Sequence, residues 1–364
     1  MSSVWNNRIS VSLFGEAHSH AVGVTINNLP AGEYIDADEI NRFMLRINRK
    51  KSDMDFLRTE NTTPHIISGI YNERTTGAPL CALIQNSVSA ETDDFSSLGR
   101  LARPGHADYT GAVRYKGFND VRDGGHFSER LTVPLCFAGA VCGQILERRG
   151  IYTGSHVAQI HTIKDNPFDY VNLKRDHIIS MREKDFPIIN DRKGWLMTEK
   201  IIKAHQEGDS LGGVVECASV NVPAGIGSPV FNGLESTIAQ LVFSIPCVTG
   251  IEFGAGFRAS RMTGSENNDE FYVDEHGHVL TKTNNHGGIL GGISSGMPIV
   301  FRVSFRPDPS VAKPQQTVDL HSMTKEAFSL DDCESCTVMR AVPCVEAAAN
   351  IALLSHMIDY PNFC

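Results

Sequence analysis

The segment Ser128–Arg148, with the sequence SERLTVPLCFAGAVCGQILER, predicts a long helix, which is the central element of the expected fold. Ser128 is a favoured N-cap residue. Apolar residues keep a helical spacing along the segment: Leu131, Leu135, Val141, Cys142 and Ile145. Pro134 leaves it undecided whether the first turns of this segment are helical, because proline disturbs a helix interior. Gly150 ends the helix, and residues 151–160 are expected to form a strand.

Strand and helix patterns alternate on both sides of this segment. Further strands are expected at 9–14, 22–28, 65–71, 79–85, 214–222, 247–253 and 298–305. Further helices are expected behind Asp36, at 197–206, at 234–242 and from Ala341 past Leu354. Residues 98–128 are expected to be a functional loop, and residues 284–296 a second, glycine-rich loop. Each half of the chain then holds strands, a long helix and one such loop. This indicates an α/β sandwich with internal pseudo-symmetry, in one domain over residues 1–364.

Composition narrows the class of protein. The net charge of -9 argues against nucleic acid as a partner, because that would need a basic surface. The N-terminus lacks an apolar signal-peptide core, and no stretch is expected to approach the ~18 apolar residues of a membrane span. We therefore expect a cytoplasmic protein without a membrane partner. Nine scattered cysteines indicate reduced thiols, and the single pair Cys333 and Cys336 lacks the second pair of a structural zinc site.

Two loops carry histidines among small or charged residues. His18 lies in the segment GEAHSH at 15–20, and His106 lies in RPGHADY at 103–109. Histidine is suited to proton transfer near neutral pH, and Arg103 and Asp108 could hold an anion and orient the imidazole. A solvated surface turn explains His18 equally simply, and a satisfied loop histidine explains His106. Spacing alone leaves both alternatives open.

Three other segments could contact an anion. Residues 124–130 precede the long helix, where free N–H groups, the helix dipole and Arg130 favour phosphate. The glycine-rich residues 284–296 match neither a Walker loop nor a dinucleotide fingerprint, so a tightly packed turn is equally consistent with them. Glu334 and Arg340 precede or begin the last helix, although a solvated acid is the ordinary interpretation of Glu334. Together, the segments favour an enzyme acting on a phosphorylated or carboxylated small molecule, without defining the reaction.

Read together, these segments resemble the chorismate synthase family from about residue 8 to about residue 356. The family motif Gly-Glu-Ser-His-Gly corresponds to residues 15–19, GEAHS. Its Arg-Pro-Gly-His-Ala-Asp-Tyr-Thr is intact at 103–110, and its Gly-Gly-Ile-Leu-Gly-Gly-Ile-Ser is intact at 287–294. Residues 208–213 (GDSLGG), 340–343 (RAVP) and the pair Glu346-Ala347 also match. The order and co-occurrence of these motifs make the resemblance specific.

The resemblance implies a fold, a reaction and a cofactor. The fold would be the β-α-β sandwich of the family, assembled as a homotetramer. The substrate would be 5-enolpyruvylshikimate 3-phosphate, an intermediate of the shikimate pathway of aromatic amino acid biosynthesis. A lyase reaction would eliminate phosphate and a ring proton in a 1,4 sense and give chorismate. Reduced FMN is required, although no net redox change occurs.

The resemblance also implies roles for individual residues. His18 corresponds to the histidine that protonates the leaving phosphate, and His106 to the histidine beside the reduced flavin. Glu334 stands where the family has an aspartate implicated in proton relay. The implied substrate-binding residues are Arg46, Arg130 and Arg340. The implied flavin-binding residues are Ser128, Gly291, Arg306, Pro307, Ser310 and Cys247, the last of which differs in type from the family residue.

Several positions depart from the family pattern. The motif Gly-Gly-Gly-Arg-Ser-Ser-Ala-Arg-Glu-Thr stands here as residues 123–132, DGGHFSERLT, so His126 and Phe127 replace an arginine and a serine at the flavin. Ile47 interrupts the arginine run that begins at Arg46, and Asp332 replaces an arginine near the cofactor. Each lost cation should weaken binding of a phosphate-bearing ligand.

Two functions of different classes follow. The first is an active chorismate synthase with a divergent flavin site, which is favoured because both His18 and His106 are retained. The alternative is a non-catalytic, chorismate synthase-like protein that binds flavin or a phosphate ester. The reversed charge at Asp332 favours this alternative.

Overall fold

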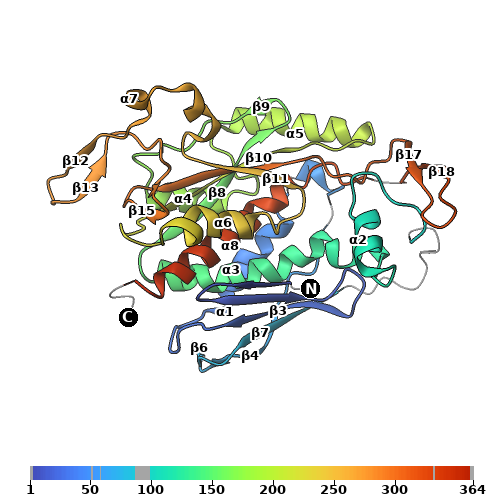
Figure 1. The fold of residues 1–364 in the computed structure, drawn as a ribbon, viewed down its shortest axis with the longest axis horizontal. Helices are drawn as coiled ribbons and strands as arrows, with labels where there is room; N and C mark the ends of the chain where they lie inside the picture. Colours follow the sequence, from blue (N-terminus) through green and yellow to red (C-terminus); the bar gives the residue numbers. More distant parts are fainter. Residues whose placement is uncertain (1–2, 51, 58, 87–98, 331–332, 361–364) are drawn as a thin grey trace.

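Two five-stranded sheets enclose a layer of helices (Figure 1). The computed structural model describes residues 3–50, 52–57, 59–86, 99–330 and 333–360. Within this part of the chain the core lies mainly between the two sheets, where the apolar faces of the strands and helices meet. The predicted α/β sandwich is confirmed, and both of its sheets are antiparallel throughout.

The N-terminal sheet has the strand order β1-β2-β3-β7-β4. Its strands are β1 (Val4–Asn6), β2 (Ser10–Phe14), β3 (Ala21–Asn27), β7 (Leu80–Gln85) and β4 (His65–Ser68). In β7 the buried residues Leu80, Ala82 and Ile84 alternate with less buried ones. Because successive side chains of a strand point to opposite faces, this alternation buries one face of the sheet against the helices.

The second sheet has the strand order β11-β16-β10-β8-β9. Its strands are β11 (Val248–Phe253), β16 (Ile299–Phe305), β10 (Gly213–Val220), β8 (Tyr152–Ile160) and β9 (Ile163–Lys164). The strands β8 and β10 are buried on both faces, because helices cover both sides of this sheet. On the outer side, Ile178 of helix α4 (Arg175–Glu183) packs onto Gly154 of β8, where a Cβ atom would lie 2.7 Å from the isoleucine side chain.

The inner layer consists of α1 (Ala37–Leu45), α3 (Thr132–Glu147), α6 (Leu234–Val242) and α8 (Val338–Met357). The predicted helix at 128–148 is confirmed as α3, which begins four residues after Ser128. Ser128 instead caps the short 3-10 turn Glu129–Leu131, by accepting a hydrogen bond from the backbone N–H of Arg130. Pro134 falls in the first turn of α3, where its missing N–H needs no partner within the helix.

Helices α3 and α8 run parallel and in close contact. Cys136 faces Cys344, Gly139 faces Ala347, and the side chain of Asn350 lies against Gly143. A Cβ atom on Gly139 would lie 2.2 Å from the Cα atom of Ala347, so a larger residue would push the helices apart. Since both helices advance together along these pairs, their N-termini lie at the same end of the layer.

The other elements lie outside this framework. The outer helix α5 (Asp191–Gln206) starts earlier than the predicted 197, because Asn190 caps it by accepting from the N–H groups of Arg192 and Lys193. Two further helices are α2 (Asp108–Tyr115) and α7 (Gly264–Asn267). Four hairpins complete the described elements: β5–β6 (Ile70–Tyr71, Arg74–Thr75), β12–β13 (Phe271–Val273, Val279–Thr281), β14–β15 (Ile289–Leu290, Ile293–Ser294) and β17–β18 (Gln315–Val318, Lys325–Phe328).

Three further sequence-based expectations were wrong. Residues 98–128 were expected to be a loop, yet they contain α2. This helix is short and has no side-chain N-cap, and its exposed Tyr109 and Val113 weaken the periodic pattern of apolar residues. Helix α4 was not predicted. The last helix starts at Val338 rather than near Ala341, because buried Val338 and Met339 extend it and Pro343 is accommodated in its interior.

Helix α8 also corrects the expectation that no stretch approaches membrane length. Its 20 residues are long and apolar enough to cross a membrane by length and composition. The whole of the apolar window is buried inside the protein, however, which is the ordinary situation of a core helix. Among the described helices, α8 alone meets the length and hydropathy criteria.

A buried ion pair joins α8 to the turn that follows α1. The guanidinium of Arg46 donates to both carboxylate oxygens of Glu346, at 2.5 and 2.6 Å. The backbone N–H and the hydroxyl of Ser155 in β8 donate to the same carboxylate, at 2.9 and 3.0 Å. Although burial acts to raise the pKa of Glu346, Arg46 outweighs it and lowers that pKa. The pair therefore connects α1, α8 and the second sheet.

We predict that Glu346→Gln destabilises the protein by about 3–5 kcal/mol, because it leaves the guanidinium of Arg46 buried without an opposing charge. Equilibrium urea unfolding measures this. Glu270→Gln makes the same change in the exposed pair with Lys282 and should leave the unfolding midpoint unchanged. Equal midpoints for wild type and Glu346→Gln would contradict the structural importance of the pair.

Candidate active site

A cavity of about 650 Å³ opens where the N-termini of α3 and α8 meet. Its walls come from β1 and β2, the loop before α3, the end of α6, the segment before β11 and the segment after β16. The polar residues that line it are Ser3, Arg103, His106, Asp123, His126, Ser128, Glu129, Thr132, Gln240, Ser244, Cys247, Arg306, Asp308, Ser310, Glu334 and Arg340. Both helix dipoles favour an anion at this end of the layer.

His106 is held by its neighbours in the RPGHADY segment. Arg103 donates to both carboxylate oxygens of Asp108, at 2.7 and 2.8 Å, and His106 Nδ1 lies 3.0 Å from Asp108 Oδ1. Nδ1 also lies 3.1 Å from Nη2 of Arg103, so it can donate to Asp108 in one tautomer or accept from Arg103 in the other. Although burial acts to raise the pKa of Asp108, the hydrogen bonds from Arg103 and His106 hold it well below its usual range.

Glycines before α3 let the loop approach this histidine. Gly124 has a positive φ of 83°, and a Cβ atom there would lie 3.0 Å from Cε1 of His106. Gly125 also has a positive φ, and a Cβ atom there would meet the carbonyl oxygen of Asp120 at 2.1 Å. Side chains at either position would therefore displace the loop from the imidazole.

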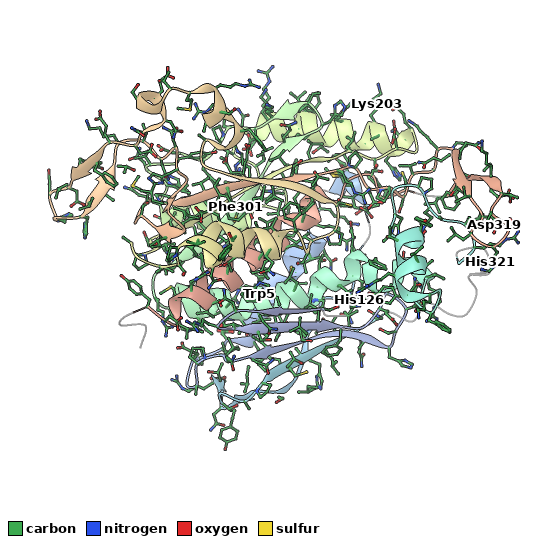
Figure 2. The ribbon with its side chains drawn as sticks, in the orientation of Figure 1. Trp5, His126, Lys203, Phe301, Asp319 and His321 are labelled. Carbon is green, nitrogen blue, oxygen red and sulfur yellow. The ribbon has the colours of Figure 1, made fainter. Side chains whose placement is uncertain are left out.

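The segment that leads to His106 is held by contacts with the β17–β18 hairpin, away from the inner layer of helices. The backbone of Ala102 bonds to Val318 of β17 at 3.2 Å, and Arg100 pairs with Asp319. Figure 2 shows Asp319 and His321 at the outer edge of the molecule, beside the β17–β18 hairpin. This hairpin therefore fixes the start of the His106 segment.

His126 has a structural role in this arrangement. Its Nδ1 lies 2.8 Å from the carbonyl oxygen of Gly15, and its Nε2 lies 2.5 Å from the hydroxyl of Ser3. Figure 2 places His126 and Trp5 along the side of the N-terminal sheet that faces the helices. Both ring nitrogens of His126 are occupied, so this residue joins the N-terminal segment to the loop before α3. The neighbouring Phe127 contributes apolar surface to the cavity.

Arg130 and Arg340 meet on opposite sides of Glu60. Arg340 donates to one oxygen of this carboxylate at 2.7 Å, and Arg130 donates to the other at 2.9 Å. Burial acts to raise the pKa of Glu60, but the two guanidinium groups outweigh it and lower that pKa. Arg130 also donates to the backbone of Asn61 and Gln85 and to the side chain of Asn86. Its guanidinium is thereby engaged within the protein.

Arg340 differs from Arg130 because part of its guanidinium is available. It is 7% exposed and lines the cavity, and its Nη1 lies 3.7 Å from Glu129. Its Nε has no hydrogen-bond partner among the residues that the structure describes. The guanidinium therefore brings positive charge to the cavity wall, where it would stabilise an anion.

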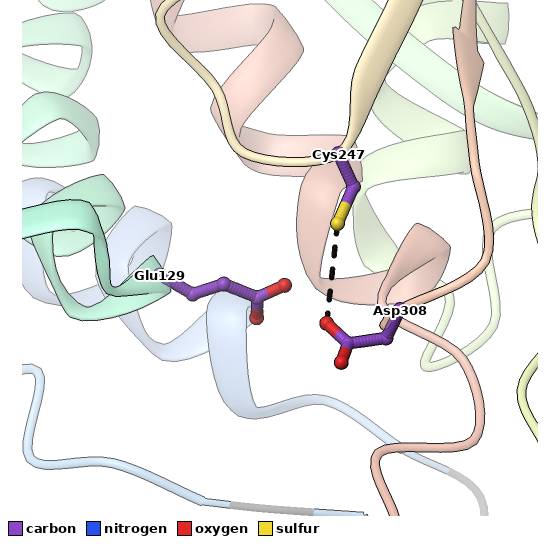
Figure 3. Close-up of side chains that lie close together, drawn as sticks. All are labelled: Glu129, Cys247 and Asp308. Carbon is purple, nitrogen blue, oxygen red and sulfur yellow. Dashed lines mark hydrogen bonds between the residues drawn. The ribbon is translucent and has the colours of Figure 1, made fainter. Parts of the chain in front are cut away.

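Three acidic groups converge on the cavity near Arg340 (Figure 3). The ligand atoms of Glu129, Cys247 and Asp308 all lie within 4.8 Å of one another, and Cys247 Sγ lies 3.9 Å from Asp308. Burial raises the pKa of Glu129 to about 7. Arg340 opposes this effect, whereas the neighbouring carboxylates of Asp308, Glu334 and Glu60 add to it. These residue types can bind a divalent cation, but the positive charge of Arg340 beside Glu129 opposes one.

The expected site residues divide into two groups. Seven line the cavity: His106, Ser128, Cys247, Arg306, Ser310, Glu334 and Arg340. Five lie outside the described lining: His18, Arg46, Arg130, Gly291 and Pro307. Asp332 falls outside the described residues. Sequence reasoning missed Glu129 and Asp308, because an isolated acid in a polar turn resembles a solvated one until packing buries it.

The residues outside the lining have identifiable surroundings. His18 lies in the turn between β2 and β3, and the N–H of its neighbour Ala17 bonds to the carbonyl oxygen of Gly125 at 3.1 Å. Arg46 is paired with Glu346 in the core, which differs from its expected contact with substrate. Gly291 forms the turn of the β14–β15 hairpin with a positive φ of 62°. Pro307 packs beside Gly212.

Comparison with known proteins agrees with this architecture. The family model described as chorismate synthase matches residues 9–358. A chorismate synthase of Thermococcus gammatolerans is 40% identical over 354 residues, covering 96% of each chain. A chorismate synthase of Dehalococcoides mccartyi is 40% identical over 367 residues, covering 98% of each chain.

A solved structure gives the same result at the level of the fold. A crystal structure of a chorismate synthase superimposes on this chain with a TM-score of 0.76 at 26% sequence identity. The match covers 97% of this chain and 93% of that one, so the two sheets, the helices between them and the cavity lie within it. By sequence over nearly its whole length and by fold, the chain belongs to the chorismate synthase family.

Proposed function

We propose that the protein is a chorismate synthase, a lyase that eliminates phosphate and a ring proton from 5-enolpyruvylshikimate 3-phosphate with the aid of reduced FMN. The observation that carries the proposal is that His106 and Arg340 line one cavity at the N-termini of α3 and α8. Histidine is suited to move a proton near neutral pH, and helix N-termini with arginine favour phosphate. Membership of the family supplies a reaction that needs both capacities.

The cavity fits a flavin in size and in chemistry. Its volume of about 650 Å³ lies within the usual range for cofactor sites. Trp5 and Phe127 offer aromatic surface, while Arg306 and Arg340 offer positive charge. The guanidinium of Arg340, which lines the cavity, suits an anionic group. When bound, reduced FMN would lend electron density transiently to the elimination, without net redox change.

The protein's own residues then have distinct roles. His106 holds or accepts a proton at Nε2, while Asp108 and Arg103 orient its ring. Glu334 lies in the same cavity and is proposed to relay a proton. His18 is proposed to protonate the departing phosphate, supported by the hydrogen bond that joins its turn to the loop before α3.

The substrate phosphate is assigned to Arg340. Arg130 is engaged by Glu60, Asn86 and backbone carbonyl groups, and Arg46 is engaged by Glu346. These two arginines instead support the cavity from within the core. Ser128, Cys247, Arg306 and Ser310 are proposed as flavin contacts within the same cavity.

The proposal extends to the setting of the enzyme. The resemblance to the family implies a homotetramer of single-domain chains. The sequence indicates a cytoplasmic enzyme of the shikimate pathway, without a nucleic-acid or membrane partner. Gly291 and Pro307 lie outside the described lining of the cavity and remain predicted flavin contacts.

We predict that the protein forms chorismate from 5-enolpyruvylshikimate 3-phosphate in the presence of anaerobically reduced FMN, as followed by absorbance. His106→Ala should lower turnover by about 10²–10⁴-fold, because it removes the oriented acid–base group. His65→Ala, at an exposed position of β4, is the matched control and should retain wild-type turnover. Wild-type turnover in His106→Ala would remove the assigned role. Flavin binding without product in the wild type would favour a non-catalytic binding protein.

We also predict that Arg340→Lys weakens binding of 5-enolpyruvylshikimate 3-phosphate by about 10- to 100-fold. Lysine keeps the charge but loses the guanidinium fork, and a hydrogen bond to a charged group contributes about 1.5–3 kcal/mol. Titration calorimetry measures the affinity, and circular dichroism checks the fold. Arg175→Lys, at an exposed position of α4, should have no effect. Unchanged affinity in a folded Arg340→Lys protein would exclude Arg340 as the phosphate contact.

A further inference from the structure

The cluster of Glu129, Cys247 and Asp308 is not accounted for by the family pattern. Glu129 stands at the position of an alanine in the motif that precedes the long helix, and Cys247 differs in type from the family residue at its position. Figure 3 shows the Glu129 side chain extending from the start of the α3 segment toward Cys247 and Asp308. All three groups line the cavity, so their charge acts directly on any ligand there.

The carboxylates of Glu129 and Asp308 are close enough that ionising both of them costs electrostatic free energy. Their ligand atoms lie within 4.8 Å of each other, and the site is only partly open to water. The negative charge of Asp308 therefore disfavours ionisation of Glu129. Burial also raises the pKa of the Cys247 thiol to about 12, so this group stays neutral and adds no charge.

The charged groups around Glu129 come from several elements. Arg340 of α8 favours its ionised form, whereas Asp308, Glu334 and Glu60 oppose ionisation. On the opposite side, Arg306 acts on Cys247. A quarter of the Glu129 side chain is exposed, and that surface faces the cavity. Burial is the largest effect on the pKa of Glu129, and together with these three acids it outweighs Arg340 and favours the protonated form.

Arg340 determines where an anion must sit. Its Nη1 lies 3.7 Å from a carboxylate oxygen of Glu129, so an anion drawn to this guanidinium comes against Glu129. An ionised Glu129 would repel it. A protonated Glu129 has an O–H group that can donate a hydrogen bond to it.

We propose that Glu129, in its protonated form, is a binding residue for a phosphate monoester in this cavity, and that the neighbouring Asp308 disfavours the ionised form of Glu129. The inference rests on the proposed function, because FMN and 5-enolpyruvylshikimate 3-phosphate both carry that chemical group. In this protein, Glu129 takes over part of the anion binding that the family assigns to arginines replaced here. Binding is therefore coupled to retention of one proton.

The sign of the pH dependence follows from this coupling. At a pH below the pKa of about 7, Glu129 is already protonated and affinity is independent of its titration. As the pH rises above that value, each binding event must take up a proton, so the dissociation constant rises by roughly tenfold per pH unit. The phosphate itself titrates at about pH 6, so measurements between about pH 7 and about pH 9 isolate the carboxyl group.

The experiment measures the dissociation constant of oxidised FMN by flavin fluorescence over that pH range, with a chelator present to exclude metal binding. Wild type should lose affinity by roughly tenfold per pH unit, and Glu129→Gln should bind with a flat profile because its amide cannot ionise. Glu199→Gln, at an exposed position of α5, removes the same charge and should keep the wild-type profile. Asp308→Asn should move the midpoint to lower pH, because it removes the neighbouring negative charge.

Parallel titrations identify which phosphate is bound. Riboflavin lacks the phosphate and should show no slope. A slope with FMN alone assigns Glu129 to the flavin phosphate, and a slope with 5-enolpyruvylshikimate 3-phosphate alone assigns it to the substrate. Equal slopes in wild type and Glu129→Gln, or a flat wild-type profile with both ligands, would overturn the inference and leave the proposed function standing. If neither ligand binds at any pH, both the inference and the proposed function are overturned.

Discussion

The structure depends on the close, parallel contact between α3 and α8. Gly139 lets the two helices approach until a Cβ atom would lie 2.2 Å from Ala347. Because the helices run in the same direction, the two free N-termini and the segments before them meet at one end of the layer. Two helix dipoles and Arg340 therefore act on the same cavity. A wider or antiparallel pairing would separate these groups.

Buried charges hold this contact in place. Arg46 and Glu346 connect α8 to the turn after α1 and to β8, while Glu60 bridges Arg130 and Arg340 beside the cavity. Each of these carboxylates stays ionised because guanidinium groups outweigh the effect of burial. Arg46 and Arg130 thus support the framework, whereas Arg340 places positive charge on the wall of the cavity.

In the cavity, the residues around His106 match the family motif, whereas the charged residues before α3 differ from it. Arg103, His106 and Asp108 keep the intact family motif and form one hydrogen-bonded group. In the loop before α3, however, the two ring nitrogens of His126 contact Gly15 and Ser3 within the protein. Glu129 brings a carboxyl group beside Arg340 instead. Ligand binding in this protein is therefore proposed to depend on the protonation of Glu129, at a position where the family motif has an alanine.

The sequence by itself determined the local elements and the family. Periodic apolar residues predicted α3, α6 and the main strands, and Asp36 predicted the start of α1, because these features depend on neighbours within a few residues. The intact motif around His106 predicted its partners Arg103 and Asp108 for the same reason. The tertiary structure alone decided that Arg46 pairs with Glu346, 300 residues away, and that Glu129 meets Cys247 and Asp308. Such contacts depend on how helices and sheets pack, and no local pattern in the chain records that geometry.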